Sequence, residues 1–242
     1  MCPAIAMAGG DVLVVVPTYN ERENLVELCE GIRAHAPEAD VLIVDDGSPD
    51  GTAAVAAELG ARLGRVDVLQ RGARRGIGSA YCDGFRLGLE RGYRRFVSMD
   101  ADLSHEPRYL PGLLAATADA DVAIGSRYLR GISVVNWSLG RLALSVAGNA
   151  YARSISGLPV RDCTSGFQCF RREVLEAIGI DRIRRNGYAF LIEIKYRAHR
   201  RGFRLCEVPI VFVERRSGRS KNGLATLFNS LWAVWALRIG RA

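Results

Sequence analysis

The first half of the chain alternates short apolar runs with longer segments of helical pattern. The pattern predicts strands at 12–16, 41–45, 66–70, 95–99 and 121–127, separated by helices at 22–35, 52–63, 77–90 and 107–117. A run that is apolar at every position, such as VLVVV at 12–16, indicates a strand buried on both faces, because a half-exposed strand alternates apolar with polar residues. The first half therefore predicts an α/β fold with a mostly parallel sheet flanked by helices.

The second half is less regular, and its elements are expected to complete the same domain. The predicted elements are an amphipathic helix at 136–156, strands at 165–170 and 203–213 (interrupted at Pro209), a helix at 189–202 and a C-terminal amphipathic helix at 223–242. A chain of 242 residues suits one large α/β domain rather than two. The predicted organisation is a disordered start over 1–11, one domain over 12–222, and the C-terminal helix.

Charge and cysteine content restrict the partners and the compartment. The net charge is +7, carried almost entirely by arginine, since Lys195 and Lys221 are the only lysines. A mildly basic surface suits a nucleotide, a lipid phosphate or a membrane face, and its charge is too diffuse to indicate nucleic acid. The six cysteines include no C-x-x-C pair, so reduced core thiols in a cytosolic protein are expected.

No segment reaches the roughly 20 uninterrupted apolar residues that a membrane-spanning helix needs. The nearest candidate, LATLFNSLWAVWALRIG at 224–240, is interrupted by Asn229, Ser230 and Arg238. Any contact with a membrane is therefore expected from one side only. The helix at 136–156 is the main candidate for that contact, although an amphipathic helix more commonly packs on its own domain.

Polar clusters follow the first, second and fourth predicted strands. They are PTYNE at 17–21, DDGS at 45–48 and DAD at 100–102. The carboxyl ends of parallel strands meet at one edge of the sheet, where ligands of open α/β sheets bind. The three clusters therefore predict a single site.

The carboxylates Asp100 and Asp102 would repel one another unless a cation lies between them and an anionic ligand. Mg²⁺ typically takes one or two protein carboxylates and completes its shell with phosphate oxygens and water. The pattern thus predicts Mg²⁺ or Mn²⁺ on Asp102, with Asp100 acting more weakly through water or binding a ribose. The alternative is a solvated acidic turn without a metal.

Other nucleotide-binding patterns find little support. The chain has neither a G-x-G-x-x-G loop after the first strand nor a G-x-x-x-x-G-K-[ST] loop. The glycine-rich stretch at 72–80 is expected to form a turn before a helix rather than a phosphate cradle. Asp46 is a candidate for binding a base or a ribose, and His105 is the only histidine near the paired carboxylates.

Six motifs together resemble the GT-A-fold glycosyltransferases of family 2. They are VVVPTYNERENL, IVDDGSPDGT, MDADLSHEP, IGSRY, TSGF and ERRSGRSK, and the resemblance runs from about residue 12 to residue 224. TSGF, GYAFLIE and the R-x-x-G-x-S-K pattern at 215–221 are similar to the dolichol-phosphate (polyprenol-phosphate) mannose synthases within that family. The resemblance makes 12–222 the GT-A (Rossmann-like) catalytic domain.

The resemblance also implies roles for individual residues. The donor nucleotide sugar would be held by Pro17, Tyr19, Glu21, Val44, Asp46, Asp100 and Ala101. Asp102 would hold the metal, and Arg127, Arg215 and Lys221 would bind phosphate or sugar oxygens, so that these four carry the catalysis. Arg141 and Ser145 would meet the phosphate of a lipid acceptor. Some relatives have Gln where this chain has Ser104, which leaves a metal contact at that position in doubt.

The implied reaction moves mannose from GDP-mannose to a polyprenyl or dolichyl phosphate with inversion, giving the β-linked product. A lipid phosphate is already anionic, so such a reaction needs no general base. One alternative is the same transfer from UDP-glucose or another nucleotide sugar, and another is a non-catalytic nucleotide-sugar-binding subunit. A peripheral position on the cytosolic face of a membrane is expected, with attachment through amphipathic helices or an anchoring subunit.

Overall fold

A computed structural model describes residues 10–214, 232 and 234–239. Within this part of the chain, no helix is both long enough and apolar enough to cross a membrane. Residues 1–9 of the predicted disordered segment and most of the predicted C-terminal helix lie outside the described residues, although 234–238 are helical. Asp11, at the end of the predicted disordered segment, is described and forms an ion pair with Arg95.

The fold is built on a seven-stranded sheet in the order β3-β2-β1-β4-β7-β5-β8. Its strands are β1 (Val12–Thr18), β2 (Asp40–Asp45), β3 (Val66–Gln70), β4 (Arg95–Ser98), β5 (Val122–Ser126), β7 (Gln168–Arg171) and β8 (Leu205–Pro209). All pairings are parallel except those of β7, which runs antiparallel to both β4 and β5. Two short strands, β6 (Val134–Val135) and β9 (Phe212–Val213), pair in a separate sheet.

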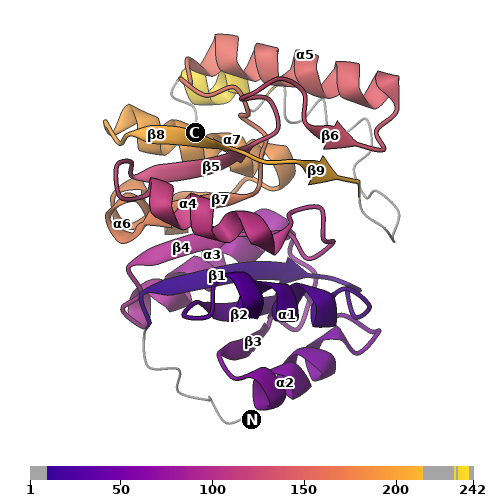
Figure 1. Ribbon diagram of the computed structural model, residues 1–242. Helices are drawn as coiled ribbons and strands as arrows, with labels where there is room; N and C mark the ends of the chain where they lie inside the picture. The colour runs from indigo at the N-terminus through magenta and orange to yellow at the C-terminus, as the bar shows by residue number, and fades with distance from the viewer. Residues whose placement is uncertain (1–9, 215–231, 233, 240–242) are drawn as a thin grey trace.

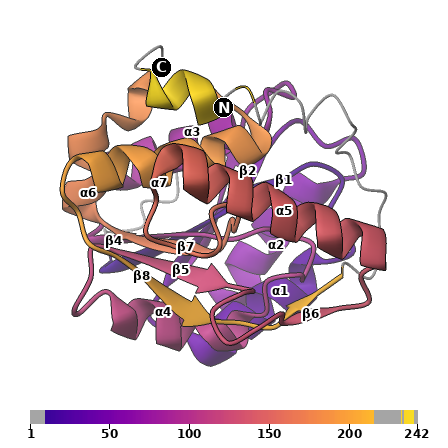
Figure 2. The same cartoon turned by 90° about the horizontal axis from the view of Figure 1, so that it is seen from above.

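Helices cover both faces of the large sheet, as Figures 1 and 2 show. The helices are α1 (Leu25–His35), α2 (Thr52–Leu63), α3 (Ile77–Glu90), α4 (Leu110–Ala116), α5 (Leu139–Ser156), α6 (Arg172–Ile178) and α7 (Gly187–Arg200). One face packs against α1, α2 and α4, and the other against α3, α6 and α7. The predicted GT-A-like arrangement is thus confirmed.

The apolar runs form strands because they supply both cores at once. In β1, Leu13 and Val15 belong to the core beneath α3 and α7, whereas Val12, Val14 and Val16 belong to the core beneath α1 and α4. All five side chains are at most 4% exposed. This two-sided burial is the reason that the run is continuously apolar.

Most differences from the predicted elements lie in the second half. The predicted strand at 165–170 begins only at Gln168, because 164–167 form a loop, and the predicted strand at 203–213 divides after Pro209 into β8 and β9. Helix α6 was not predicted, since seven residues hold too few turns for a periodic pattern. The helix predicted at 107–117 is a 3₁₀ turn, Pro107–Tyr109, followed by α4.

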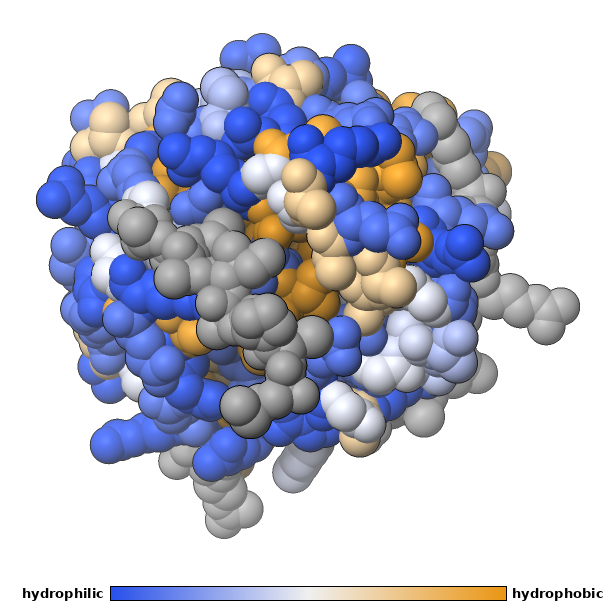
Figure 3. All heavy atoms as spheres, turned by 90° about the horizontal axis from the view of Figure 1, so that it is seen from below, coloured by the Kyte–Doolittle hydropathy of each residue, from blue (hydrophilic) through white to orange (hydrophobic). Residues whose placement is uncertain are grey.

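Helix α5 lies at the end of the molecule beyond β5 and β8 (Figure 1). Most of the exposed large hydrophobic side chains belong to it, to the segment before it and to the C-terminal helix: Ile132, Val135, Leu139, Leu144, Val146, Trp232, Trp235 and Ile239. The opposite end of the molecule is mainly hydrophilic, with hydrophobic residues showing chiefly near its middle (Figure 3). The molecule therefore has one end richer in exposed apolar side chains.

Candidate active site

The three predicted polar clusters meet at one edge of the sheet. Strands β2, β1 and β4 are neighbours and parallel, so the loops that follow them emerge side by side. Because β7 is antiparallel, the segment that precedes it, 162–167, reaches the same edge. Ser98 at the end of β4 donates a hydrogen bond to the Gly166 carbonyl, 2.7 Å away. The TSGF motif is thus part of the same site.

The loops after β1 and β2 are joined by hydrogen bonds between their polar residues. The Asn20 amide donates to Ser48 Oγ at 2.9 Å, and the Glu21 amide donates to Thr52 Oγ1 at 3.1 Å. Asn20 has a positive φ of 58°, which asparagine tolerates better than most residues. Much of the polar character of PTYNE and DDGSPDGT therefore serves to build the two loops.

The neighbouring aspartates after β2 have different surroundings. Asp45 is 2% exposed and accepts hydrogen bonds from Thr18 Oγ1 and from the Ser48 amide. Asp46 accepts from the amides of Arg75 and Gly76, at 3.2 and 3.1 Å. Asp45 therefore fixes the turn, whereas Asp46 joins it to the loop before α3.

A buried arginine completes the surroundings of Asp46. The Arg71 side chain is 1% exposed, and its Nη1 lies 3.1 Å from Asp46 Oδ1. Arg71 Nε lies 3.2 Å from Asp83, so the guanidinium bridges two carboxylates. Neither Asp46 Oδ1 nor Arg71 Nε has a partner with hydrogen-bond geometry within the described residues. In the part of the chain that the structure describes, Asp46 Oδ1 and Arg71 Nε are therefore paired by charge but not by a hydrogen bond.

The other donor-site candidates after the first two strands differ in exposure. Tyr19 and Pro17 are partly exposed, and the guanidinium carbon of Arg74 lies 4.6 Å above the centre of the Tyr19 ring. Val44 is fully buried, and its side chain packs in the core. The side chain of Val44 is therefore not available to a ligand.

The glycine-rich stretch at 72–80 forms a turn that leads into α3. The amides of Gly78 and Ser79 both point to Asn186 Oδ1, at 3.1 and 3.3 Å. These amides belong to the first turn of α3, where an anion would otherwise be held. The side chain of Asn186 occupies the place that a bound phosphate would take.

Asp100 follows β4 and is partly exposed. Its Oδ1 accepts a hydrogen bond from Tyr81 Oη at 3.0 Å, and its backbone amide donates to His105 Nδ1 at 3.2 Å. Burial, together with the charge of Asp100, raises the pKa of Tyr81 well above its usual value, so this hydroxyl stays a donor. A Cβ at Gly166 would lie 3.6 Å from Asp100 Oδ2, so Gly166 keeps this side of the carboxylate open.

Asp102 is partly exposed and is bound by the next turn of its own loop. Its Oδ1 accepts hydrogen bonds from the amide and the hydroxyl of Ser104, at 3.2 and 2.5 Å. Ser104 is itself 1% exposed, while Ala101 packs into the core. Ser104 therefore orients Asp102 through one oxygen.

The described residues contain no group of three or more His, Cys, Asp or Glu side chains able to hold a metal. Asp100 and Asp102 supply hard oxygen ligands that suit Mg²⁺ or Mn²⁺. A cation here would take one or two carboxylates and fill its remaining positions with phosphate oxygens and water. The donor set therefore fits a metal that binds together with a polyphosphate.

Arg127 follows β5 and is held by Asp162 and Thr164. Its Nε and Nη2 lie 2.7 and 2.6 Å from the two Asp162 oxygens, and Nη2 also donates to Thr164 Oγ1 at 2.7 Å. Burial disfavours the charge on Arg127, but Asp162 outweighs it and raises the pKa of the guanidinium. The pair therefore stays ionised, and Nη1 is the nitrogen not used in these contacts.

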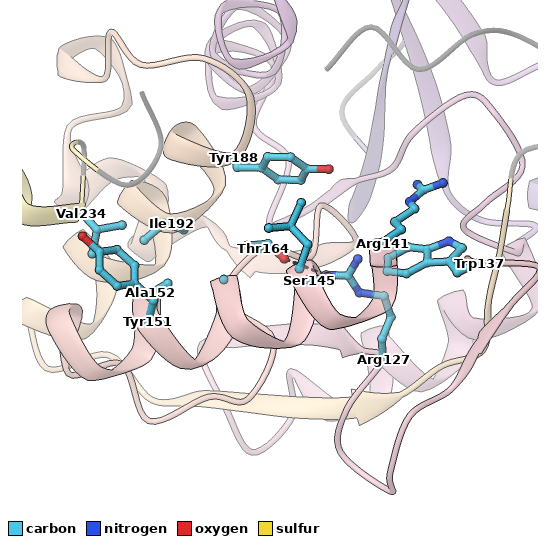
Figure 4. Close-up of a pocket in the computed structure, with 12 residues that line it drawn as sticks. Arg127, Trp137, Arg141, Ser145, Tyr151, Ala152, Thr164, Tyr188, Ile192 and Val234 are labelled. Atoms are coloured by element: carbon cyan, nitrogen blue, oxygen red, sulfur yellow. Dashed lines mark hydrogen bonds between the residues drawn. The ribbon is translucent and has the colours of Figure 1, made fainter. Parts of the chain in front are cut away.

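Arg141 and Ser145 lie one turn apart on α5. The guanidinium of Arg141 stacks over Trp137, 4.3 Å from the ring centre, and pairs with Glu214. Ser145 Oγ lies 2.8 Å from Tyr128 Oη. Both side chains line the pocket drawn in Figure 4, as Arg127 does.

A single pocket joins these residues. It has a volume of about 130 Å³ between α5, α7 and the C-terminal helix, and it is lined by Arg127, Trp137, Arg141, Leu144, Ser145, Gly148, Tyr151, Ala152, Thr164, Tyr188, Ile192 and Val234. The arginines lie at one end, and Tyr151, Ile192 and Val234 lie toward the other (Figure 4). The pocket thus has a cationic end and a mainly apolar end, as a phosphate on an apolar chain would require.

The sequence prediction of this site was incomplete. Arg215 and Lys221 lie outside the described residues. Asp162, Tyr81 and Arg71 were not predicted, although each directly contacts a predicted site residue. TSGF pointed to the segment beside Asp162. No sequence pattern indicated Tyr81 or Arg71, because Tyr81 and Asp100, like Arg71 and Asp46, are far apart in the sequence and meet only in the folded chain.

The chain is similar in sequence to known proteins. Residues 13–179 match the family described as Glycosyl transferase family 2. The chain is 45% identical over 240 residues to polyprenol monophosphomannose synthase of Mycolicibacterium smegmatis, covering 98% of this chain and 91% of that protein. It is 48% identical over 210 residues to undecaprenyl-phosphate mannosyltransferase of Micrococcus luteus, covering 87% and 86% of the two chains.

Solved structures support the fold. Glucosyl-3-phosphoglycerate synthase of Mycobacterium tuberculosis, in complex with Mn²⁺, UDP and phosphoglyceric acid, matches with a TM-score of 0.68 at 20% identity, over 97% of this chain and 79% of that chain. A mannosyltransferase of Pyrobaculum calidifontis, in complex with GDP-Man and Mn²⁺, matches with a TM-score of 0.59 at 19% identity, over 96% and 70%. With residues 13–179 matched to this family and nearly the whole chain matched by the Mycolicibacterium relative, the chain belongs to glycosyl transferase family 2.

Proposed function

We propose that the chain transfers mannose from GDP-mannose to a polyprenyl phosphate and gives the β-linked lipid product. The observation that carries this proposal is the pocket of α5 and α7, where cationic groups and an apolar wall meet. Thr164 of this pocket lies two residues before Gly166, which is a neighbour of Asp100. The two bacterial relatives, named for mannosyl transfer to polyprenyl phosphates, match nearly the whole chain. We assign 12–222 to the catalytic domain.

The donor is proposed to bind over the loops of β1, β2 and β4. Tyr19, Glu21 and Asp46 lie where the nucleoside would be held, and Asp100 and Asp102 lie where the diphosphate would meet a divalent cation. Such a cation, Mg²⁺ or Mn²⁺, would neutralise the charge of the departing GDP. The Mn²⁺ and GDP-Man named for the Pyrobaculum structure support this assignment. Arg215 and Lys221 are proposed to bind donor phosphate oxygens.

The acceptor is proposed to bind in the pocket, with its phosphate at the arginine end. Arg127 Nη1 and the guanidinium of Arg141 would hold phosphate oxygens, with Ser145 donating a hydrogen bond. The phosphate would then displace Glu214 from Arg141. An ionised phosphate is itself the nucleophile, so the residues only have to position it and balance its charge. Attack from the side opposite GDP inverts the anomeric carbon.

A peripheral position on the cytosolic face of a membrane is part of the proposal. The exposed apolar side chains Leu139, Leu144 and Val146 belong to α5, the helix that also lines the pocket. Insertion of these side chains into the lipid surface would bring the pocket to the acceptor without a membrane-spanning helix. An anchoring subunit would strengthen this attachment.

Donor choice is tested by offering radiolabelled GDP-mannose and UDP-glucose separately, with a polyprenyl phosphate and Mn²⁺, and by extracting the lipid. The proposal predicts label in the organic phase from GDP-mannose and little from UDP-glucose. Label chiefly from UDP-glucose would identify a different sugar donor. Label from neither donor, with nucleotide binding retained, would favour a non-catalytic binding protein.

A further inference from the structure

Lys195, in the middle of α7, is a lysine without any exposed surface. Its Nζ lies 3.0 Å from the Cys163 carbonyl, 2.8 Å from the Ser165 carbonyl and 2.9 Å from the Leu191 carbonyl. An ammonium group has three protons to donate, and here each has one carbonyl acceptor. The contacts therefore use the full hydrogen-bonding capacity of a protonated lysine.

No acidic side chain forms an ion pair with Lys195 within the described residues, since every acceptor of its Nζ is a backbone carbonyl. Burying an ammonium without a carboxylate partner is costly. An apolar side chain would fill this part of the core more cheaply. The contacts of Lys195 must therefore do something that an apolar side chain does not.

The segment that Lys195 holds is the one that positions Arg127. Cys163 and Ser165 flank Thr164, and Asp162 immediately precedes them. Asp162 and Thr164 together bind the Arg127 guanidinium at the cationic end of the pocket (Figure 4). A shift of the 163 and 165 carbonyls would therefore move both partners of Arg127.

We propose that Lys195 is a positioning residue of the acceptor site, whose ammonium fixes the 162–166 segment and, through Asp162 and Thr164, the guanidinium of Arg127. The assignment rests on the proposed function, because Arg127 serves the acceptor phosphate only in that reaction. Lys195 itself lines neither the pocket nor the metal site.

Titration of Lys195 gives this proposal a specific pH signature. Burial is the largest influence and lowers the pKa of Lys195 to about 8. The positive charge of Arg127 also lowers this pKa, whereas the negative charges of Asp162 and Glu207 raise it. Cys163 also faces the amine, but burial raises the pKa of this thiol to about 12, so it stays neutral. Above about pH 8 the amine keeps two of its three protons, and one carbonyl loses its donor.

The folded state binds this proton more weakly than the unfolded chain does, whose lysine titrates near 10.5. The contribution of Lys195 to stability therefore rises as the pH rises from about 8 to about 10.5. The positioning role predicts the opposite trend for the acceptor, whose KM should increase above about pH 8. A purely structural role would produce the stability trend alone.

The variants are Lys195→Met, which fills the space without a donor, and Lys195→Gln, which keeps two donors. Ile194→Ala is the matched control, because Ile194 is a buried neighbour on α7 that does not line the pocket. With Lys195→Met we expect the acceptor kcat/KM to fall at least about 10-fold, mostly through KM, while the donor KM changes less than about 2-fold. The rise of acceptor KM above about pH 8 should disappear, and Lys195→Gln should recover part of the loss.

The proposal would be overturned if Lys195→Met lowered kcat/KM equally for donor and acceptor, and if Ile194→Ala, at the same loss of stability, lowered them by the same amount. So would a wild-type acceptor KM that stays constant from about pH 7.5 to about pH 9.5. This second measurement needs no variant and decides the question even if Lys195→Met fails to fold.

A readout independent of transfer comes from the low lysine content. The chain contains only Lys195 and Lys221, so NMR of isotope-labelled lysine side chains gives two amine signals. The signal of Lys195, assigned with Lys195→Gln, should titrate near pH 8 and shift when a short-chain prenyl phosphate is added, but not with GDP alone. A Lys195 signal that prenyl phosphate leaves unchanged would contradict the coupling. Absence of transfer by the wild type, with this shift retained, would overturn the proposed reaction and leave the coupling standing.

Discussion

At the scale of single residues, Asp100 and Asp102 differ in the hydrogen bonds that their carboxylates accept. Asp100 accepts a hydrogen bond from the buried Tyr81, whereas Asp102 accepts hydrogen bonds from the amide and hydroxyl of Ser104 in its own loop. Asp102 is also partly exposed, so we expect its carboxylate to be accessible to a ligand.

Replacement of Asp102 by alanine is expected to reduce transfer by at least about 100-fold, a loss typical of removing a group that stabilises charge in the transition state. The circular dichroism spectrum and thermal midpoint should stay near those of the wild type, because Asp102 is a partly exposed loop residue and its hydrogen bonds to Ser104 lie within that loop. Mn²⁺ binding in the presence of GDP should be lost as well. Ser104→Ala should cost much less, and a fully active Asp102→Ala would remove the metal assignment.

Replacement of Arg141 by alanine is expected to raise the acceptor KM by about 10-fold or more and to leave donor binding nearly unchanged, because the side chain lines the acceptor pocket. Arg153→Ala is the matched control, since Arg153 is an exposed arginine on the same helix outside this pocket. Calorimetric titration with GDP-mannose separates the two substrates. Weakened donor binding with normal acceptor use would assign Arg141 to the wrong substrate.

At the scale of elements, α3 approaches the sheet closely through its glycines. A Cβ at Gly84 would lie 2.5 Å from Cγ1 of Val15, and a Cβ at Gly88 would lie 2.5 Å from a side-chain carbon of Leu13. These distances are too short for any Cβ contact. Helix α3 can therefore keep its position against β1 only with glycine at these sites.

Gly84→Ala is expected to lower the free energy of unfolding by about 1–3 kcal/mol, because the added methyl group overpacks the core. The control is Gly140→Ala in α5, where nothing lies within 4 Å of the added Cβ. That change should stabilise the protein by up to about 1 kcal/mol through helix propensity. Urea unfolding measures both, and equal effects would show that the packing of α3 is looser than described.

Helix α5 is expected to hold the protein at a lipid surface. Leu139 is 84% exposed, so Leu139→Glu should lower binding to lipid vesicles in co-sedimentation without changing thermal stability. Val26→Glu places the same charge on an exposed apolar position of α1 and should leave vesicle binding unchanged. Equal vesicle binding by the wild type and both variants would remove α5 from the membrane contact.

The predictability of the elements follows their burial. The ends of all five strands predicted in the first half lie within two residues of the observed ends. These strands are predictable because residues such as Val14 and Ile43 are buried on both faces of the sheet, which requires a continuous apolar run in the sequence. The antiparallel direction of β7 is set by its pairing with β4 and β5. The sequence of β7, QCFR, contains no pattern that indicates this direction. For the same reason, the position of Asp162 opposite Arg127 was not predictable from the sequence.

At the scale of the whole molecule, four cysteines are sealed in the two cores. Burial is the main cause that raises the pKa of Cys29, Cys82, Cys163 and Cys169 to about 12, so at pH 8 only about 1 in 10⁴ of each thiol is ionised. A thiol reagent should label at most the other two cysteines quickly in the native protein and all six after unfolding in guanidinium. Rapid native labelling of three or more thiols would show that a core opens easily.

The whole account depends on the proposal that Asp102 would hold a divalent cation serving the diphosphate of the donor, while the pocket of α5 and α7 would hold the acceptor phosphate. Crystals soaked with GDP-mannose and Mn²⁺ test this most directly, because the anomalous signal of manganese locates the ion without assumption. We predict manganese on Asp102, with the nucleotide over the loops of β1 and β2. A nucleotide bound elsewhere on the molecule, with no ion at Asp102, would contradict the account.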